Sequence, residues 1–329
     1  MPCPRVLITS PAAAEANNGN WHTAWRWSQM LSPTFDVSIA QHWNGEPFDV
    51  MLALHARRSA DSIARWAQAR GALNNAPGLA VVLTGTDLYR DIQTNAQAQA
   101  SLRLASRLVV LQECGPDALP LDLRPKTRVI FQSTAPHDAQ TKPTDALRVV
   151  MVGHLRNEKS PQTLFEAARR LNGHPDILIE HLGEALEPAL ADEARACMAE
   201  CPHYRWLGGM AHADTLQKIA QAHVLVHTSQ MEGGAHVILE AVCNGTPVLA
   251  SRISGNVGML GADYCGYFAL GDAAGLASLL LRCRAELGHS DGLLAQLSRQ
   301  CAQRVPLFSP ATEQTAVLAL VHDLLHANT

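Results

Sequence analysis

Two glutamates flank a Gly-Gly pair in one stretch of the chain, and their types and spacing suit chemistry on a nucleotide-bound sugar. The stretch reads Met231-Glu232-Gly233-Gly234-Ala235-His236-Val237-Ile238-Leu239-Glu240. Glycines let backbone N–H groups approach phosphate oxygens. A helix that begins near Ala235 would add its free N–H groups and the positive end of its dipole. Glu240 lies one turn into that helix, within reach of a ribose diol, and Glu232 lies at the strand end, within reach of sugar hydroxyls.

A strand, a glycine turn and a helix with two solvated glutamates is the simpler interpretation, because short glycine motifs occur by chance. The residues that follow favour the site. Gly245 ends the helical pattern as a C′ glycine, and a second apolar run leads into Ser254-Gly255-Asn256. His236 and Glu240 are four residues apart and share one helical face.

Residues 223–256 as a block resemble the nucleotide-sugar site of the retaining GT-B glycosyltransferases of family 4. The resemblance implies an α/β protein of GT-B fold, with two doubly wound Rossmann-like domains facing a central cleft. It also implies a catalytic role for Glu232. The residues that it implies for binding the UDP-sugar in this block are Gly233, Gly234, Ala235, His236, Val237 and Glu240.

Two cations follow a predicted strand at 147–152, where ligands of open α/β sheets bind. Arg156 and Lys159 would there neutralise a diphosphate leaving group. A solvated loop with Ser160 as a helix cap is the alternative. Relatives usually carry arginine where this chain has His154, and glycine where it has Ser160, so the resemblance implies a catalytic Lys159 with Arg156 as a displaced substitute.

Further donor-side residues are expected in two glycine-containing segments. Trp206-Leu207-Gly208-Gly209-Met210 resembles the segment whose backbone meets the base, which implies Gly209 and Met210 as UDP-sugar contacts. A structural glycine turn fits that segment equally well. In the first half, residues 16–22 follow the first strand, and Gly19 and Asn20 are expected to meet the donor. An Asn-Gly turn with a helix N-cap also explains that loop.

Arginines gather after two strands of the first half. Leu54-His55-Ala56-Arg57-Arg58-Ser59 ends one strand and Thr84-Gly85-Thr86-Asp87-Leu88-Tyr89-Arg90-Asp91 ends the next. Adjacent arginines suit a phosphate-like dianion, although a plain surface pair is the default. Most relatives carry histidine where this chain has Thr84.

These segments, with Asn-Asn-Gly-Asn-Trp and Val-Val-Leu-Gln-Glu, resemble the selenosugar synthases of selenoneine biosynthesis over nearly the whole chain. The resemblance implies a carbon–selenium bond formed between selenophosphate and UDP-N-acetylglucosamine or UDP-glucose. It implies no cofactor or metal, and a functional link to the enzyme that transfers selenium from the selenosugar to hercynine. The residues expected to hold selenophosphate are His55, Arg57, Arg58, Thr84 and Arg90. An ordinary retaining glycosyltransferase with a hydroxyl or sulfur acceptor and a non-catalytic nucleotide-sugar sensor are the alternatives.

Composition excludes several other classes of protein. The 329 residues are 47% hydrophobic and 17% charged, which is typical of a globular chain of two domains. A net charge of −4 does not indicate the basic surface that nucleic-acid-binding proteins carry. No apolar run reaches the length of a membrane span, and Met1-Pro2-Cys3-Pro4-Arg5 leads into a strand without a signal-peptide core. We therefore expect a cytoplasmic protein with no membrane partner and reduced, mostly buried thiols.

Strand and helix patterns alternate through the chain and predict parallel sheets. Strands are predicted at 6–9, 49–55, 79–84, 107–111, 128–131, 147–152, 177–182, 205–207, 223–228, 247–250 and 267–270. A polar segment at 133–144 reads as a linker. We predict an acceptor-side domain at 1–138 and a nucleotide-sugar domain at 139–310. An amphipathic helix at 311–329 is expected to pack back on the first domain, as the resembled fold implies.

Overall fold

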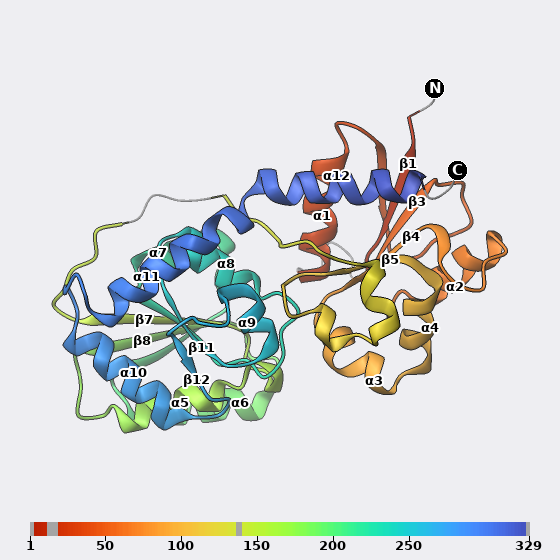
Figure 1. Ribbon diagram of the computed structural model, residues 1–329. Helices are drawn as coiled ribbons and strands as arrows, with labels where there is room; N and C mark the ends of the chain where they lie inside the picture. Colours follow the sequence, from red (N-terminus) through yellow and green to blue (C-terminus); the bar gives the residue numbers. More distant parts are fainter. Residues whose placement is uncertain (1–2, 12–18, 136–139, 327–329) are drawn as a thin grey trace. The chain divides into compact units, whose positions relative to one another are not determined.

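The computed structural model describes residues 3–11, 19–135 and 140–326, and the chain forms two compact units. The first unit comprises Met1–Ser133 and Pro310–Thr329, and the second comprises Thr134–Ser309. Each unit contains a parallel six-stranded sheet with helices on both faces (Figure 1). Alternating strand and helix signals predict this arrangement, because parallel neighbours need a crossover connection.

The first sheet has the order β2-β1-β3-β4-β5-β6. Its strands are β1 (Arg5–Thr9), β2 (Asp36–Ala40), β3 (Val50–Leu54), β4 (Ala76–Leu83), β5 (Ala105–Val110) and β6 (Thr127–Val129). Its helices are α1 (Gly19–Leu31), α2 (Ala60–Ala69), the π-helix η2 (Asp87–Asp91), α3 (Ile92–Thr94), α4 (Ala96–Leu104), the 3₁₀ turns η3 (Pro116–Ala118) and η4 (Leu121–Lys126), and α12 (Pro310–His326).

Alternating side chains of this sheet build two cores, one on each face. Val6 and Ile8 of β1 pack with Trp27 of α1 and with buried residues of α12. Leu7, between them, packs on the opposite face with Trp66 of α2 and with α4. This period of two is the reason that strands buried on both faces are apolar almost throughout.

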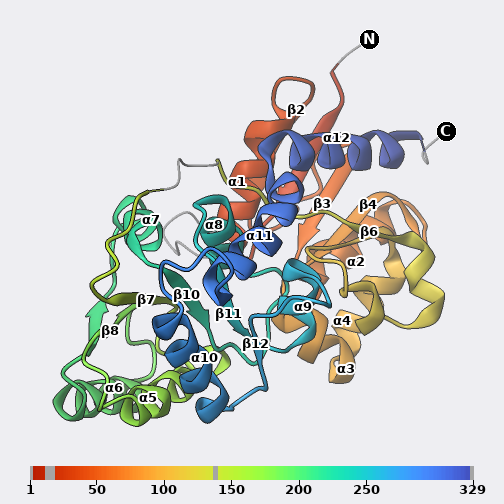
Figure 2. The ribbon, with the colours of Figure 1, turned by 60° about the vertical axis from the view of Figure 1, so that its left-hand side comes forward.

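The C-terminal helix α12 is anchored to the first unit by a buried carboxylate. Glu313, whose side chain is 0% exposed, accepts two hydrogen bonds from Arg26 at 2.7 and 2.9 Å. It also accepts from Trp27 Nε1 at 2.7 Å and from Ser133 Oγ at 2.5 Å. Such a carboxylate is stable in the interior only because it is paired and fully hydrogen-bonded. The helix therefore belongs to the first unit, beside α1 (Figure 2).

The second sheet has the order β12-β11-β10-β7-β8-β9. Its strands are β7 (Leu147–Val152), β8 (Ile177–Leu182), β9 (Tyr204–Gly208), β10 (Val224–His227), β11 (Val248–Ser251) and β12 (Tyr267–Phe268). Its helices are the 3₁₀ turn η5 (Asn157–Lys159), α5 (Pro161–Arg170), α6 (Pro188–Glu200), α7 (His212–Gln221), α8 (His236–Cys243), α9 (Ser254–Leu260), α10 (Ala273–Ala285), α11 (Leu293–Arg304) and the 3₁₀ turn η6 (Val305–Phe308). Helix α5 packs on α6 and α10, and helix α8 packs on α7 and α11 (Figure 1).

The predicted strands all occur, those at 147–152 and 177–182 with the predicted ends and the others with shifted ends, and one strand among the described residues was missed. The missed strand is β2, a half-exposed strand at the edge of the first sheet, whose short alternation does not stand out from its neighbours. The unit boundaries fall at Ser133/Thr134 and Ser309/Pro310, where the sequence suggested 138 and 310. Five of the eight cysteines are buried, and none of the eight forms a disulfide in the structure. No helix among the described residues is long and apolar enough to cross a membrane.

Candidate functional site

The second sheet brings Lys159 and Glu232 together at its topological switch point. From β7 the chain passes to β8 on one side, while β10 pairs with β7 on the other, and ligands of open α/β sheets bind where the strand order reverses in this way. The segment after β7 carries Lys159, and the loop after β10 carries Glu232. Lys159 Nζ donates to Glu232 Oε1 at 2.6 Å, and the two side chains are 14% and 13% exposed.

Glu232 has a second neighbour in the buried imidazole of His227. His227 Nε2 lies 3.3 Å from Glu232 Oε1, and its side chain is 2% exposed. Burial by itself raises the pKa of Glu232, but the Lys159 ammonium and His227 outweigh it and hold that pKa well below its usual range. Burial lowers the pKa of His227, and Glu232 only partly opposes this. The pair at neutral pH is therefore an ionised Glu232 with Lys159, beside a neutral imidazole.

Glu240 forms a second carboxylate centre on α8. Its side chain is 6% exposed, and Oε1 accepts from His236 Nδ1 at 2.9 Å and from His212 Nε2 at 2.7 Å. Burial raises the pKa of Glu240, yet the hydrogen bonds from His212 and His236 lower it to about 2. The helix begins at His236 with Ala235 as its N-cap, so the free N–H groups of its first turn follow Gly233 and Gly234.

The loop that carries Glu232 is packed against the start of α9. A Cβ atom built on Gly255 would lie 2.0 Å from the backbone oxygen of Glu232, so only glycine fits there. Beside it, the Asn256 amide donates to the backbone oxygen of Ser251, whose hydroxyl donates to the Ser229 carbonyl. This buried network ties the loop after β10 to the loop after β11.

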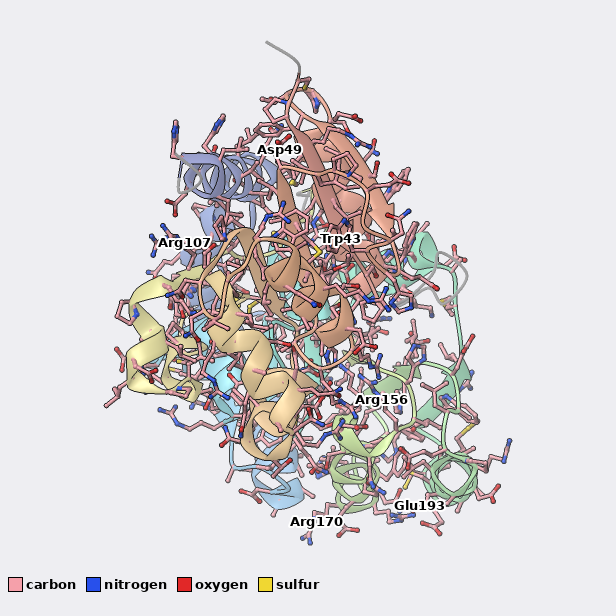
Figure 3. All side chains as sticks on the ribbon, turned by 90° about the vertical axis from the view of Figure 1, so that its right-hand side faces the viewer. Trp43, Asp49, Arg107, Arg156, Arg170 and Glu193 are labelled. Atoms are coloured by element: carbon pink, nitrogen blue, oxygen red, sulfur yellow. The ribbon has the colours of Figure 1, made fainter. Side chains whose placement is uncertain are left out.

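Arg156 and Ser160 flank Lys159 in the segment after β7. Arg156, labelled in Figure 3, has a buried Nε with no hydrogen-bond partner among the described residues. Ser160 has a φ of 46°, in the left-handed region that favours glycine. It is the N-cap residue of α5, but its side chain makes no capping hydrogen bond and lies 3.2 Å from Thr163 Oγ1. His154 accepts a hydrogen bond from the Glu184 N–H at 3.0 Å and so holds the loop after β8.

The glycine segment after β9 has the turn that the sequence allowed. Gly208 has a φ of 74°, and a Cβ built on Gly209 would lie 2.6 Å from the Glu184 side chain. Met210 is 37% exposed and lies two residues before the first residue of α7, His212. A structural turn and a nucleotide contact are thus both compatible with Gly209 and Met210.

The first sheet brings together the two arginine-bearing segments that follow β3 and β4. His55 is buried, with a φ of 71°, a conformation that costs free energy in a non-glycine residue. Its Nε2 lies 3.3 Å from Thr86 Oγ1 and 3.8 Å from Asp91 Oδ2. Burial lowers the pKa of His55, and Asp87 only partly opposes this.

Two aspartates organise the cations of this region. Asp91, which is 6% exposed, accepts from Arg57 Nε at 2.8 Å, and Arg90 Nε lies 3.5 Å from its other oxygen. Asp87, fully buried, accepts from the N–H groups of Ala56, Thr84 and Gly85 at 2.9 to 3.0 Å and thereby clamps the two segments together. Arg57 and Arg58 are exposed.

Gly19 and Asn20 are the first two residues of α1, and the Gly19 carbonyl accepts from Thr23 Oγ1 at 2.8 Å. The rest of the expected loop, residues 16–18, lies outside the described residues. Sequence reasoning missed several polar groups, namely His227, His212, Asp87 and Asp91. His227 stood inside an apolar run, and His212 reaches Glu240 from 28 residues away, so no local spacing reveals it.

Comparison with known proteins places this geometry in context. Residues 133–280 match the family described as "Glycosyl transferases group 1". The lipopolysaccharide core biosynthesis glycosyltransferase LpsE of Rhizobium meliloti (strain 1021) is 31% identical over 168 residues, which are 48% of this chain and 48% of that protein. The chain thus spans about half the length of this curated relative.

Solved structures are similar over almost the whole chain. The sucrose-phosphate synthase of Thermosynechococcus elongatus has a TM-score of 0.76 at 17% identity, covering 99% of this chain and 100% of that one. HepE of Anabaena, in complex with UDP and glucose, has a TM-score of 0.72 at 15% identity and covers 97% and 100%. The predicted α/β class with two Rossmann-like GT-B domains is confirmed, and the match to the group 1 glycosyl transferases covers Lys159, Glu232 and Glu240.

Proposed function

We propose that this chain is a UDP-sugar-dependent glycosyltransferase. The observation that carries the proposal is the Lys159–Glu232 ion pair at the switch point of the second sheet, in the same unit as the buried carboxylate of Glu240. The group 1 match over 133–280 and the UDP complexes of the structurally similar HepE support it. A cation beside a sugar-facing carboxylate suits a reaction in which negative charge develops on a departing diphosphate.

The roles proposed for this chain's residues follow from their charge and burial. Glu240 accepts hydrogen bonds from the ribose hydroxyl groups. The first N–H groups of α8, together with Lys159, hold the diphosphate. Glu232 accepts hydrogen bonds from hydroxyl groups of the sugar. Arg156 adds a second cation on the same segment as Lys159. Among the described residues, no group of three or more His, Cys, Asp or Glu side chains is arranged to hold a metal ion.

For the acceptor we propose selenophosphate, with UDP-N-acetylglucosamine as the donor. The anionic selenium attacks the anomeric carbon, and the bond from that carbon to the UDP oxygen breaks with its electron pair on UDP. Water then attacks phosphorus and releases phosphate, while the electron pair of the P–Se bond stays on selenium. An anionic, soft nucleophile needs no general base with a matched pKa. It needs cations that hold its phosphate.

The cluster after β3 and β4 supports this acceptor. Arg57 and Arg58 are exposed, and Asp91 fixes one face of Arg57 through Nε, which leaves the terminal nitrogens of that guanidinium to a ligand. Arg90 and His55 lie around the same aspartate. Thr84 donates its N–H to Asp87 and so helps to shape the loop. The sequence resemblance to selenosugar synthases is the second support.

Replacement of both arginines tests the acceptor assignment. Arg57→Ala with Arg58→Ala is expected to abolish the dependence of UDP release on selenophosphate while UDP-sugar binding persists. Lysine replacements are expected to restore little, because an ammonium lacks the planar fork of guanidinium. Arg124→Ala with Arg128→Ala, on the same unit, is a matched control. Wild-type kinetics in the Arg57/Arg58 double variant would contradict the assignment.

The second candidate is a glycosyltransferase with a hydroxyl acceptor, which the likeness to the lipopolysaccharide core enzyme favours. The two acceptors are distinguished by the same assay. An enzyme with a hydroxyl acceptor would release UDP once an alcohol acceptor is added, with or without selenophosphate, and the double arginine variant would then keep its turnover.

A further inference from the structure

We propose that His212 is a positioning residue of the nucleoside site, which holds the Glu240 carboxylate in the orientation that binds the ribose diol. The inference rests on the proposed function and adds a residue that lies outside the Glu-Gly-Gly stretch. His212 is the first residue of α7, whereas Glu240 is in the second turn of α8.

The hydrogen bonds around Glu240 are one-sided. Both imidazoles donate to the same oxygen, Oε1, from His212 at 2.7 Å and from His236 at 2.9 Å. No donor among the described residues pairs with Oε2. The residue is 5% exposed, so few other groups can reach it. Two donors on one oxygen fix the plane of the carboxylate and leave the second oxygen as the acceptor for a hydroxyl group.

His212 is well suited to be the adjustable member of this pair. His236 is held on the same helix, four residues before Glu240, whereas His212 reaches across from α7 and has a side chain that is 67% exposed. Because Nε2 donates to Glu240, the exposed Nδ1 edge of the ring can meet solvent or a nucleoside. Met210, 37% exposed, precedes it on the segment after β9. The nucleoside would therefore bind between the loop after β9 and the start of α8.

His212 can be distinguished from Glu240 by pairing variants with ligands that lack the diol. Calorimetry would measure the binding of UDP and of 2′,3′-dideoxy-UDP to the wild type, His212→Ala, His212→Gln and Gln217→Ala. In the wild type, loss of the diol is expected to weaken binding by about 10- to 100-fold, the usual effect of one hydrogen bond to a charged group. In His212→Ala, this preference for UDP is expected to fall to a few-fold.

The remaining variants separate positioning from general damage. In the His212→Gln variant, the side-chain amide can donate a hydrogen bond to Glu240 as the imidazole does. Most of the preference for UDP over the dideoxy ligand is therefore expected to return. Gln217, exposed on the same helix, is a matched control, and its replacement by alanine is expected to change nothing. In steady-state assays, His212→Ala is expected to raise KM for the UDP-sugar about 10-fold with little change in kcat.

Each outcome bears on a definite claim. A wild-type protein that binds no UDP would overturn the proposed function and this inference with it. A wild type that prefers UDP over the dideoxy ligand, together with an equally selective His212→Ala, would overturn the role of His212 alone. Failure of His212→Gln to restore the preference would also contradict positioning through this hydrogen bond.

Discussion

Glu232, which is partly buried, and Glu240, which is buried, are carboxylates that stay ionised, but their partners differ. Glu232 is paired with the ammonium of Lys159, whereas Glu240 is held by two imidazoles. An ammonium beside the first carboxylate suits the reacting diphosphate and sugar. Two imidazole donors on the second carboxylate suit a binding contact that does not take part in bond breaking.

This division predicts different effects for the two replacements. Glu240→Ala is expected to weaken UDP binding by about 1.5–3 kcal/mol, because the ribose diol loses a charged acceptor. Glu232→Gln is expected to impair turnover far more than UDP affinity. Titration of each folded variant with UDP and with UDP-sugar, beside kcat measurements, tests both. Equal losses of UDP affinity in the two variants would show that the roles are not divided in this way.

The His212–Glu240 pair predicts a pH window for stability. The hydrogen bond to Glu240 raises the pKa of His212 above its ordinary 6.5, so the stabilisation by His212 is complete below that value and is lost as pH rises through the raised pKa. The pKa of Glu240 is lowered from 4.5 to about 2, so its stabilisation is present above 4.5 and is lost as pH falls toward 2. The His212–Glu240 pair therefore stabilises the fold most between the ordinary pKa of glutamate, 4.5, and that of histidine, 6.5.

Urea denaturation of the wild type and His212→Ala checks the window. The difference in free energy of unfolding is expected to be larger at about pH 5.5 than at about pH 9, and to stay within about 1 kcal/mol because the imidazole is exposed. A difference that does not change with pH would show that the pair carries no charge-dependent stabilisation.

The site residues that lie at short, regular spacings could be predicted from the sequence, whereas pairs of residues far apart in the chain could not. Lys159, Glu232 and Glu240 stand at fixed offsets from glycines and strand ends, so the sequence predicted them as site residues. Asp91 approaches Arg57 across 34 positions, because neighbouring parallel strands end at one edge of a sheet. Patterns within one amino-acid sequence do not show which residues of neighbouring strands will pair.

At the scale of elements, helix α12 joins the first unit through the buried carboxylate of Glu313, through Asp323, which pairs with Arg107, and through its apolar face. The sequence marked an amphipathic helix there, because its apolar period is local. It did not reveal Glu313 as the anchor, since the partners Arg26 and Trp27 lie 287 and 286 positions away. The helix buries Val317, Leu320, Val321 and Leu324 against the sheet and α1.

Glu313→Ala is expected to destabilise the first unit by about 3–5 kcal/mol, because it leaves the Arg26 guanidinium without its buried partner. Thr315→Ala, at an exposed position of the same helix, is expected to change stability by no more than about 0.5 kcal/mol. Chemical denaturation with a probe in the first unit measures both. If the two variants unfold alike, the anchor carries no special share of the stability of this unit.

At the scale of the whole molecule, both units are doubly wound sheets, and in each a cluster of charged side chains follows the carboxyl ends of neighbouring strands. The proposed reaction uses Lys159 and the start of α8, rather than a divalent ion, to hold the diphosphate. An activity assay in excess EDTA is therefore expected to give the same rate as an untreated one. A loss of activity that magnesium or manganese restores would contradict this account of the leaving group.

The central claim is that this chain transfers a sugar from UDP to selenophosphate, and the release of UDP tests it most directly. The purified protein is incubated with UDP-N-acetylglucosamine, with and without selenophosphate, and UDP is quantified over time. The account predicts that UDP release depends on selenophosphate and that Glu232→Gln suppresses it. UDP released at the same rate without selenophosphate would contradict the acceptor, and so would the absence of UDP release under both conditions.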